Sequence, residues 1–164
     1  MVVSKRHHMP EKISFAEALK KLEHYCAYQE RCHQEVASKL KQLGIQKPED
    51  DLLIVNLIEN NFLNEERFAR SFARGKHRIK FWGHNRIITE LKARHISATN
   101  IKLALTEISN EEYTETFEKI AEKTWDSITE KNQLKKRKKF CDYLLRKGWE
   151  SDWVYEKVKQ LEKE

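Results

Sequence analysis

The side chains with the widest chemical range in this sequence are its cysteines and histidines. Cys26 and Cys32 lie near His24 and His33, and all four are residue types that bind zinc. Neither a C-x-x-C nor an H-x-x-x-H pair is present, however. We therefore interpret these cysteines and Cys141 as reduced thiols of a cytoplasmic protein. We expect no metal site and no cofactor.

Motifs that bind nucleotides or activate a nucleophile are missing from the sequence. The 4 glycines stand at positions 44, 75, 83 and 148, so neither a G-x-x-x-x-G-K-[ST] loop nor a G-x-S-x-G turn is present. His77 and His84 have no neighbouring carboxylates in a relay pattern. We therefore expect no catalytic residues and a protein that is not an enzyme.

Positive charge is the strongest chemical signal, and it is unevenly distributed. The net charge is +6, with Lys and Arg concentrated in residues 65–110 and 131–149 and Asp and Glu concentrated in residues 111–130 between them. Two interpretations follow: the charges pair across neighbouring helices, or they bind a polyanion or an acidic protein groove. The five consecutive cations at 135–139 repel one another, which favours the second interpretation.

The candidate binding residues are cations of these two basic blocks. They are Arg70, Arg74, Lys76, Arg78, Lys80 and Arg86 in the first block and Lys136, Arg137 and Lys139 in the second. Reversing the charge of Arg70, Arg74 and Arg78 should abolish partner binding and leave the helices intact. Trp82 lies among the first set, where it either stacks on a nucleic-acid base or shields a helix junction.

Composition predicts an all-α fold for these 164 residues. Only 4 glycines and 2 prolines are present, which is too few for a turn-rich β fold, and 35% of residues are charged, mostly with helix-forming side chains. The longest apolar run, residues 52–55, is far below the ~20 residues of a membrane span. Residues 1–11 are expected to be a flexible segment without a secretory signal.

A repeat runs through the chain, and residues 35–45, 86–96 and 139–149 align with one another. The apolar columns of the alignment are Val36, Ile87 and Phe140; Leu40, Leu91 and Leu144; and Ile45, Ile96 and Trp149. The spacing of four residues between the first two columns places them on one helical face. Gly44, His95 and Gly148 share the position of a left-handed helix cap.

Helix-start signals flank each repeated segment. Ser14 with Glu17 forms a capping-box pattern, and Asn64 and Asn110 each precede two glutamates. Pro48, Ser97 and Ser151 mark the starts of later helices. The long helix of each repeat should bury an apolar stripe: Phe15, Leu19, Leu22 and Cys26; Phe68, Phe72 and Ile79; and Tyr113, Phe117 and Ile120.

The sequence therefore predicts three tandem three-helix repeats, each with a long helix followed by two shorter ones. We place them at residues 12–62, 63–109 and 110–164 after the segment 1–11. Because each repeat alone is too small to bury a large core, we expect the three to stack into an elongated, curved body.

Within this pattern, residues 62–69 (Phe-Leu-Asn-Glu-Glu-Arg-Phe-Ala), Trp82-Gly83 and residues 86–96 resemble the RecX family, regulators of the recombinase RecA. His95 stands where that family usually has glycine. The resemblance implies a regulator that binds RecA and its single-stranded DNA filament and lowers RecA's ATPase, strand-exchange and coprotease activities. DNA repair, homologous recombination and the SOS response are the processes it would affect. We expect a cytoplasmic monomer that does not bind membranes and binds DNA weakly.

Two alternatives from other classes stay open at this point. One is a helix-turn-helix-like module that binds DNA without RecA, although the segment from Ser97 to Ile108 carries only Lys102 as a cation. The other is a helical scaffold that binds only protein. Titration with single-stranded DNA, with and without RecA and ATP, separates all three.

Overall fold

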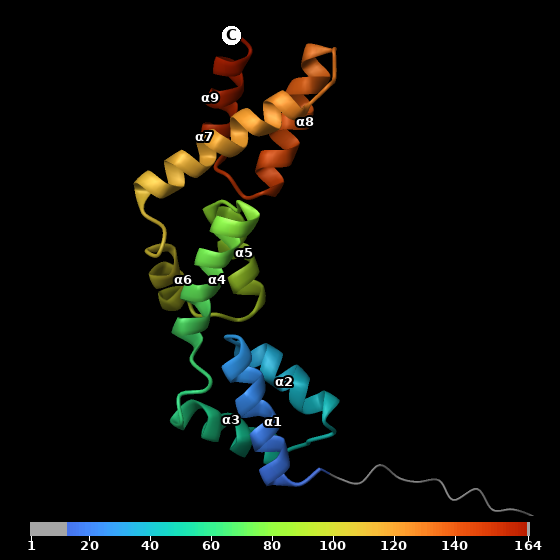
Figure 1. Cartoon of the computed structure of the whole chain (residues 1–164), viewed down its shortest axis with the longest axis vertical. Helices are drawn as coiled ribbons and strands as arrows, with labels where there is room; N and C mark the ends of the chain where they lie inside the picture. Colours follow the sequence, from blue (N-terminus) through green and yellow to red (C-terminus); the bar gives the residue numbers. More distant parts are fainter. Residues whose placement is uncertain (1–12, 164) are drawn as a thin grey trace, which may run out of the picture. The chain divides into compact units, whose positions relative to one another are not determined.

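The regular secondary structure is helical throughout the part of the chain that the computed structural model describes, residues 13–163 (Figure 1). Within these residues there are nine α-helices and no strand, which confirms the all-α expectation. The segment 1–11 that the sequence predicts to be flexible lies outside the described residues.

The helices follow the predicted long, short, short pattern three times. In chain order they are α1 (Phe15–Tyr28), α2 (His33–Gln42), α3 (Glu49–Glu59), α4 (Glu65–Lys80), α5 (His84–Ala93), α6 (Ala98–Leu105), α7 (Asn110–Ser127), α8 (Gln133–Arg146) and α9 (Ser151–Leu161). The first helix of each triplet has 14, 16 and 18 residues, respectively.

Two compact units make up the chain, one ending at Asn64 and the other beginning at Glu65. The first contains α1 to α3, which all contact one another, and the second contains α4 to α9. In the second unit α6 packs along α4, and α9 packs on α8. The three repeat boundaries and the curved stacking stay predictions.

The apolar columns of the sequence repeat form the centres of the three helix triplets. Val36, Ile87 and Phe140 have no exposed surface, and Leu91 and Leu144 are equally buried. The remaining members, Leu40, Ile45, Ile96 and Trp149, are at most 5% exposed. The equivalent residues therefore perform the same packing role in each triplet, as the repeat predicts.

The predicted apolar stripe of α4 is wrong at its end. Ile79 is 71% exposed, whereas His77 is fully buried, as are Ala69 and Ala73. Positions 69, 73 and 77 follow the four-residue spacing of one helical face. The alanines carry too little hydrophobicity to mark that face in the sequence. Phe15 at the start of α1 is also 40% exposed, contrary to the predicted stripe.

Caps close the helices mostly where the sequence places them. Ser14 and Glu17 form the predicted capping box, and Ser97 accepts a hydrogen bond from the Asn100 amide, 3.2 Å away. One predicted cap is wrong by one residue, because Ser109, not Asn110, caps α7. Ser151 is the first residue of α9, as the sequence predicts.

Left-handed backbone ends the middle helix of each triplet. Gly44, His95 and Gly148 have φ of 74°, 59° and 89°, which confirms the predicted caps. Gly148 has a second constraint, because a Cβ there would collide with the backbone of Arg86. The Gly83 amide donates to the Lys147 carbonyl at 2.8 Å, so α5 begins directly against the end of α8.

Candidate functional site

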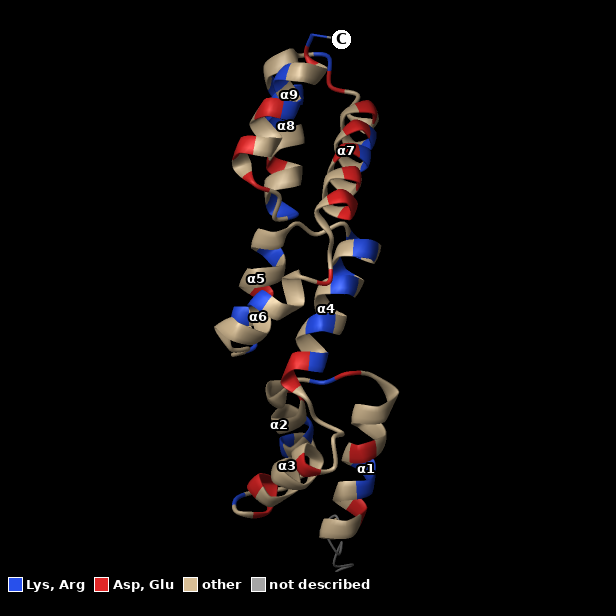
Figure 2. Cartoon of the chain, turned by 90° about the vertical axis from the view of Figure 1, so that its left-hand side faces the viewer, with Lys and Arg blue, Asp and Glu red and all other residues tan. Residues whose placement is uncertain are grey.

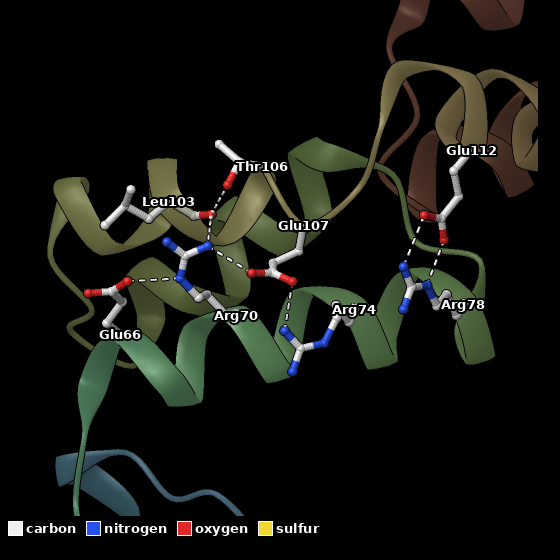
Figure 3. Close-up of polar contacts among 8 residues, drawn as sticks. All are labelled: Glu66, Arg70, Arg74, Arg78, Leu103, Thr106, Glu107 and Glu112. Carbon is white, nitrogen blue, oxygen red and sulfur yellow. Dashed lines mark hydrogen bonds and ion pairs between the residues drawn. The ribbon is translucent and has the colours of Figure 1, made fainter.

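Three arginines at four-residue spacing on α4 make a row of ion pairs, which we call the paired row (Figure 3). Arg70 binds Glu66 at 2.8 Å and Glu107 at 2.7 Å, and its Nη1 also donates to the Leu103 carbonyl. Arg74 binds the second oxygen of Glu107 at 2.7 Å. These contacts hold α4 against α6 and the segment that follows it.

Arg78 extends the paired row to the next triplet. Its guanidinium donates two hydrogen bonds to Glu112 of α7, at 2.6 and 3.0 Å. The Arg74 and Arg70 guanidinium groups lower the pKa of Glu107, and Arg78 lowers the pKa of Glu112 in the same way. The positive charge of the paired row is therefore largely matched by carboxylates of the same unit.

This pairing changes the meaning of the charge-reversal expectation. Glutamates at positions 70, 74 and 78 would face Glu66, Glu107 and Glu112, so the variant would disturb the packing of α4 as well as any partner contact. The sequence interpretation in which charges pair across neighbouring helices describes these three arginines. Their partners lie up to 37 residues away in the chain, beyond the reach of a local pattern.

The second basic block is also partly neutralised. Arg137 binds Glu162 at 3.3 Å, Lys138 binds Asp142 at 2.6 Å, and Lys139 binds Glu130 at 3.2 Å. The Lys136 ammonium lies over the ring of Trp125, 4.1 Å from its centroid. The five consecutive cations are thus distributed around α8, as helical geometry requires.

The helix ends next to Trp82 carry a different set of cations, and we call it the Trp82 cluster. Its members are Lys76, Lys80, Arg86, Arg146 and Lys147. Lys76 and Arg86 both lie over the Trp82 ring, 5.1 and 4.1 Å from its centroid. Arg86 donates to the Arg146 carbonyl at 3.1 Å, and the Lys147 ammonium donates to the Lys80 carbonyl at 3.0 Å.

The cluster differs from the paired row in its counter-charges. Among the described residues, none of its five cations makes an ion pair with a carboxylate. Lys80 and Arg146 are exposed, and the other three cations of the cluster are half-buried. In the view of Figure 2, Lys and Arg colour much of α4, whereas Asp and Glu mark α7.

Sequence reasoning found Lys76, Lys80 and Arg86 but missed Arg146 and Lys147. Both stand near the end of the third repeated segment. Lys147 aligns with Leu43 of the first repeat and Arg94 of the second, and Arg146 is the residue before it. They join the cluster because α5 begins where α8 ends, a contact between residues 60 to 67 positions apart. The repeat alone does not encode that contact.

Trp82 itself is half-buried and packs edge-on against Phe72, with centroids 6.2 Å apart. Its backbone carbonyl is 2.9 Å from Nδ1 of His77. These contacts agree with the interpretation of Trp82 as a residue that shields the helix junction. The cations over its ring also hold it in the middle of the cluster.

An aromatic cluster packs at this junction, where the start of α5 meets the end of α8. The Tyr113 ring stacks on His84 at 3.8 Å and on His77 at 5.4 Å between centroids. The Tyr113 hydroxyl donates to Glu150 at 2.7 Å and accepts from the His84 amide. Burial lowers the pKa of His77, so its imidazole is neutral at pH 7. The junction is therefore a packed interior that gives the cluster a fixed geometry.

The three cysteines lie in the interior of the protein. Cys26, Cys32 and Cys141 are buried thiols, and burial raises the pKa of Cys32 and Cys141. From Ile13 to Lys163, no three metal-binding side chains come together. No helix in the same range has the length and apolar character needed to cross a membrane.

Comparison with known proteins gives a consistent result. A family model described as the second three-helix domain of RecX matches residues 64–105, and one described as the third three-helix domain matches residues 111–158. A regulatory protein RecX of Lactobacillus gasseri is 35% identical over 89 residues, which are 54% of this chain and 33% of that protein. One of Halalkalibacterium halodurans is 29% identical, over 86% of this chain and 55% of that protein.

Solved structures match the fold as well. A crystal structure of a regulatory protein RecX has a TM-score of 0.77 at 24% identity, over 89% of this chain and 73% of that one. RecX from Lactobacillus salivarius has a TM-score of 0.73 at 24% identity, over 90% of this chain and 96% of that one. The chain spans from 33% to 62% of the length of the curated relatives it matches. The two domain matches together cover more than half of the sequence, and the chain belongs to the RecX family.

Proposed function

We propose that this chain is a non-enzymatic regulator that binds RecA and its single-stranded DNA filament and lowers RecA's recombinase, ATPase and coprotease activities. It would act as a monomer in the cytoplasm, in DNA repair, homologous recombination and the SOS response. Family membership supports the regulatory class. The resemblance to regulators of RecA supplies the partner.

The observation that carries the contact is the Trp82 cluster. A filament on single-stranded DNA presents phosphates, and cations without internal counter-charges can neutralise them with release of bound counterions. The five cations come from three helix ends that the junction holds together. Phosphate contacts of this kind position a protein on DNA without reading sequence.

Direct DNA binding by a reading helix is less well supported. The helix that would occupy the groove, α6, contains Lys102 as its single basic residue. A reading helix normally presents several donors to base edges and nearby phosphates. The cations instead lie on α4, α5 and the end of α8, which favours backbone contact.

RecA's DNA-dependent ATPase, measured with increasing amounts of this protein, tests the proposal. The parent should lower the ATPase rate, and Lys80→Glu with Arg146→Glu should raise the concentration needed by about tenfold or more, as expected for lost phosphate contacts. Lys102→Glu with Lys159→Glu is the matched control, because it makes the same change in net charge at exposed positions. A parent without any effect on RecA would overturn the proposal.

A further inference from the structure

A hollow of about 460 Å³ lies between α7, α8 and the segment that joins α4 to α5. It shares Arg146 with the Trp82 cluster, and Phe81, the residue before Trp82, lines its wall. Its volume is within the range of about 300–1,000 Å³ that is typical of small-ligand sites. The hollow is therefore continuous with the cationic surface and large enough for a small organic group.

The walls of the hollow combine flat rings, hydroxyl groups and cations. Tyr143 and Phe81 supply the rings, and Thr124 and Ser127 supply hydroxyl groups. Ile120, which is 7% exposed, adds an apolar side chain to the lining. A ligand in this space would meet both apolar and polar groups.

The net charge at the hollow is positive. Lys123 and Arg146 make no ion pair with a carboxylate among the described residues. The other two charged residues of the lining already have partners: Lys139 binds Glu130, and Asp142 binds Lys138. The ligand that complements this lining carries a negative group beside a flat, partly apolar one.

We propose that this hollow takes one unstacked nucleotide of a single strand, with its base against Tyr143 and its adjoining phosphates on Lys123 and Arg146. Single-strand binding proteins combine a cationic track with aromatic side chains in this way. Continuity with the Trp82 cluster favours a nucleotide over a side chain of a protein partner, because the strand's phosphates continue onto Lys80 and Lys147. This inference rests on the proposed function for the strand's presence.

Fluorescence anisotropy with two labelled probes tests the inference on the full chain. One probe is an oligothymidylate of about 12 nucleotides, and the other is an abasic strand of the same length and charge. Tyr143→Ala and Tyr143→Leu remove the ring, and Tyr143→Leu keeps an apolar side chain so that the protein folds. Tyr143→Phe keeps the ring, and Tyr155→Ala removes an exposed tyrosine of α9 as the matched control.

Loss of the ring should weaken binding of the oligothymidylate by about 5- to 10-fold and leave binding of the abasic strand unchanged. Tyr143→Phe and Tyr155→Ala should bind both probes like the parent. Equal effects on the two probes, or none on either, would overturn the inference. Weaker binding to RecA without DNA, with unchanged binding of both probes, would assign the hollow to a protein anchor and overturn it too.

The two proposals fail separately in these measurements. A parent that binds the oligothymidylate through Tyr143 but leaves RecA's ATPase unchanged contradicts the proposed function alone. A parent that lowers the ATPase rate but binds both probes equally contradicts the nucleotide site alone.

Discussion

Two sets of cations on and around α4 have similar sequence signatures but different surroundings. The paired row, Arg70, Arg74 and Arg78, is held by Glu66, Glu107 and Glu112. The Trp82 cluster, which begins with Lys76 and Lys80 on the same helix, meets rings and carbonyl oxygens instead. The comparison teaches that a cation is available to a partner only where folding places no carboxylate beside it. The net charge of a segment does not reveal this.

The largest expected effect comes from Gly148, which lies where the end of α8 meets the start of α5 in the Trp82 cluster. Gly148→Ala should lower the free energy of unfolding by about 2 kcal/mol or more, from the left-handed backbone and the collision with Arg86. Gly44→Ala has a similar φ and open space, so it should cost about 1 kcal/mol. Denaturant unfolding of both variants checks this. Equal costs would show that the tight contact between α5 and α8 is not what constrains Gly148.

A second expectation separates the two cation sets by stability. Changing Arg70, Arg74 and Arg78 to glutamate should lower the melting temperature, because each new carboxylate faces an existing one. Changing Lys80, Arg146 and Lys102 to glutamate makes the same change in net charge and should leave the melting temperature near that of the parent. Thermal unfolding followed by circular dichroism measures both. If the two triple variants have the same melting temperature, the ion pairs of the paired row make no specific contribution to stability.

Acidification should weaken the junction beneath the Trp82 cluster before it weakens the paired row. The pKa of His77 in the folded protein lies below its usual 6.5, chiefly because of burial. The unfolded state therefore binds the proton more readily, and stability falls as pH decreases from about 6.5 toward the folded pKa. The Glu107 and Glu112 pKa values are lowered from 4.5, so their contribution is lost only below that pH. In the parent, the midpoint of denaturant unfolding should fall between pH 7 and pH 5, and His77→Gln should remove this fall. A fall that persists in the variant would contradict this assignment.

The smallest effect is expected at His95, which adopts φ of 59° without the freedom of glycine. His95→Gly should raise the free energy of unfolding by about 0.5–1 kcal/mol by removing the left-handed strain. Denaturant midpoints at constant slope measure the change. A loss of stability would show that the imidazole makes contacts worth more than the strain.

The sequence predicted the repeated core because helical packing leaves a local pattern. Leu40, Leu91 and Leu144 occur four residues after Val36, Ile87 and Phe140, and all six are buried. The error at Ile79 and His77 has a physical reason, because the buried face of α4 is built from alanines and a histidine, which hydrophobicity does not mark. Long-range contacts explain what was missed at the candidate site. Glu107 and Lys147 reach α4 from 33 and 67 residues away, and no local spacing indicates either contact.

The salt dependence of single-strand binding tests the central claim most directly, since it counts the phosphate contacts that a protein makes. For single strands, each contact contributes about 0.7 to the slope of log affinity against log salt concentration. Lys80→Gln with Arg146→Gln should reduce the slope by about 1.4, whereas Arg74→Gln with Arg78→Gln should leave it unchanged. The reverse result, with the slope lost in the paired row and kept in the Trp82 cluster, would contradict the account.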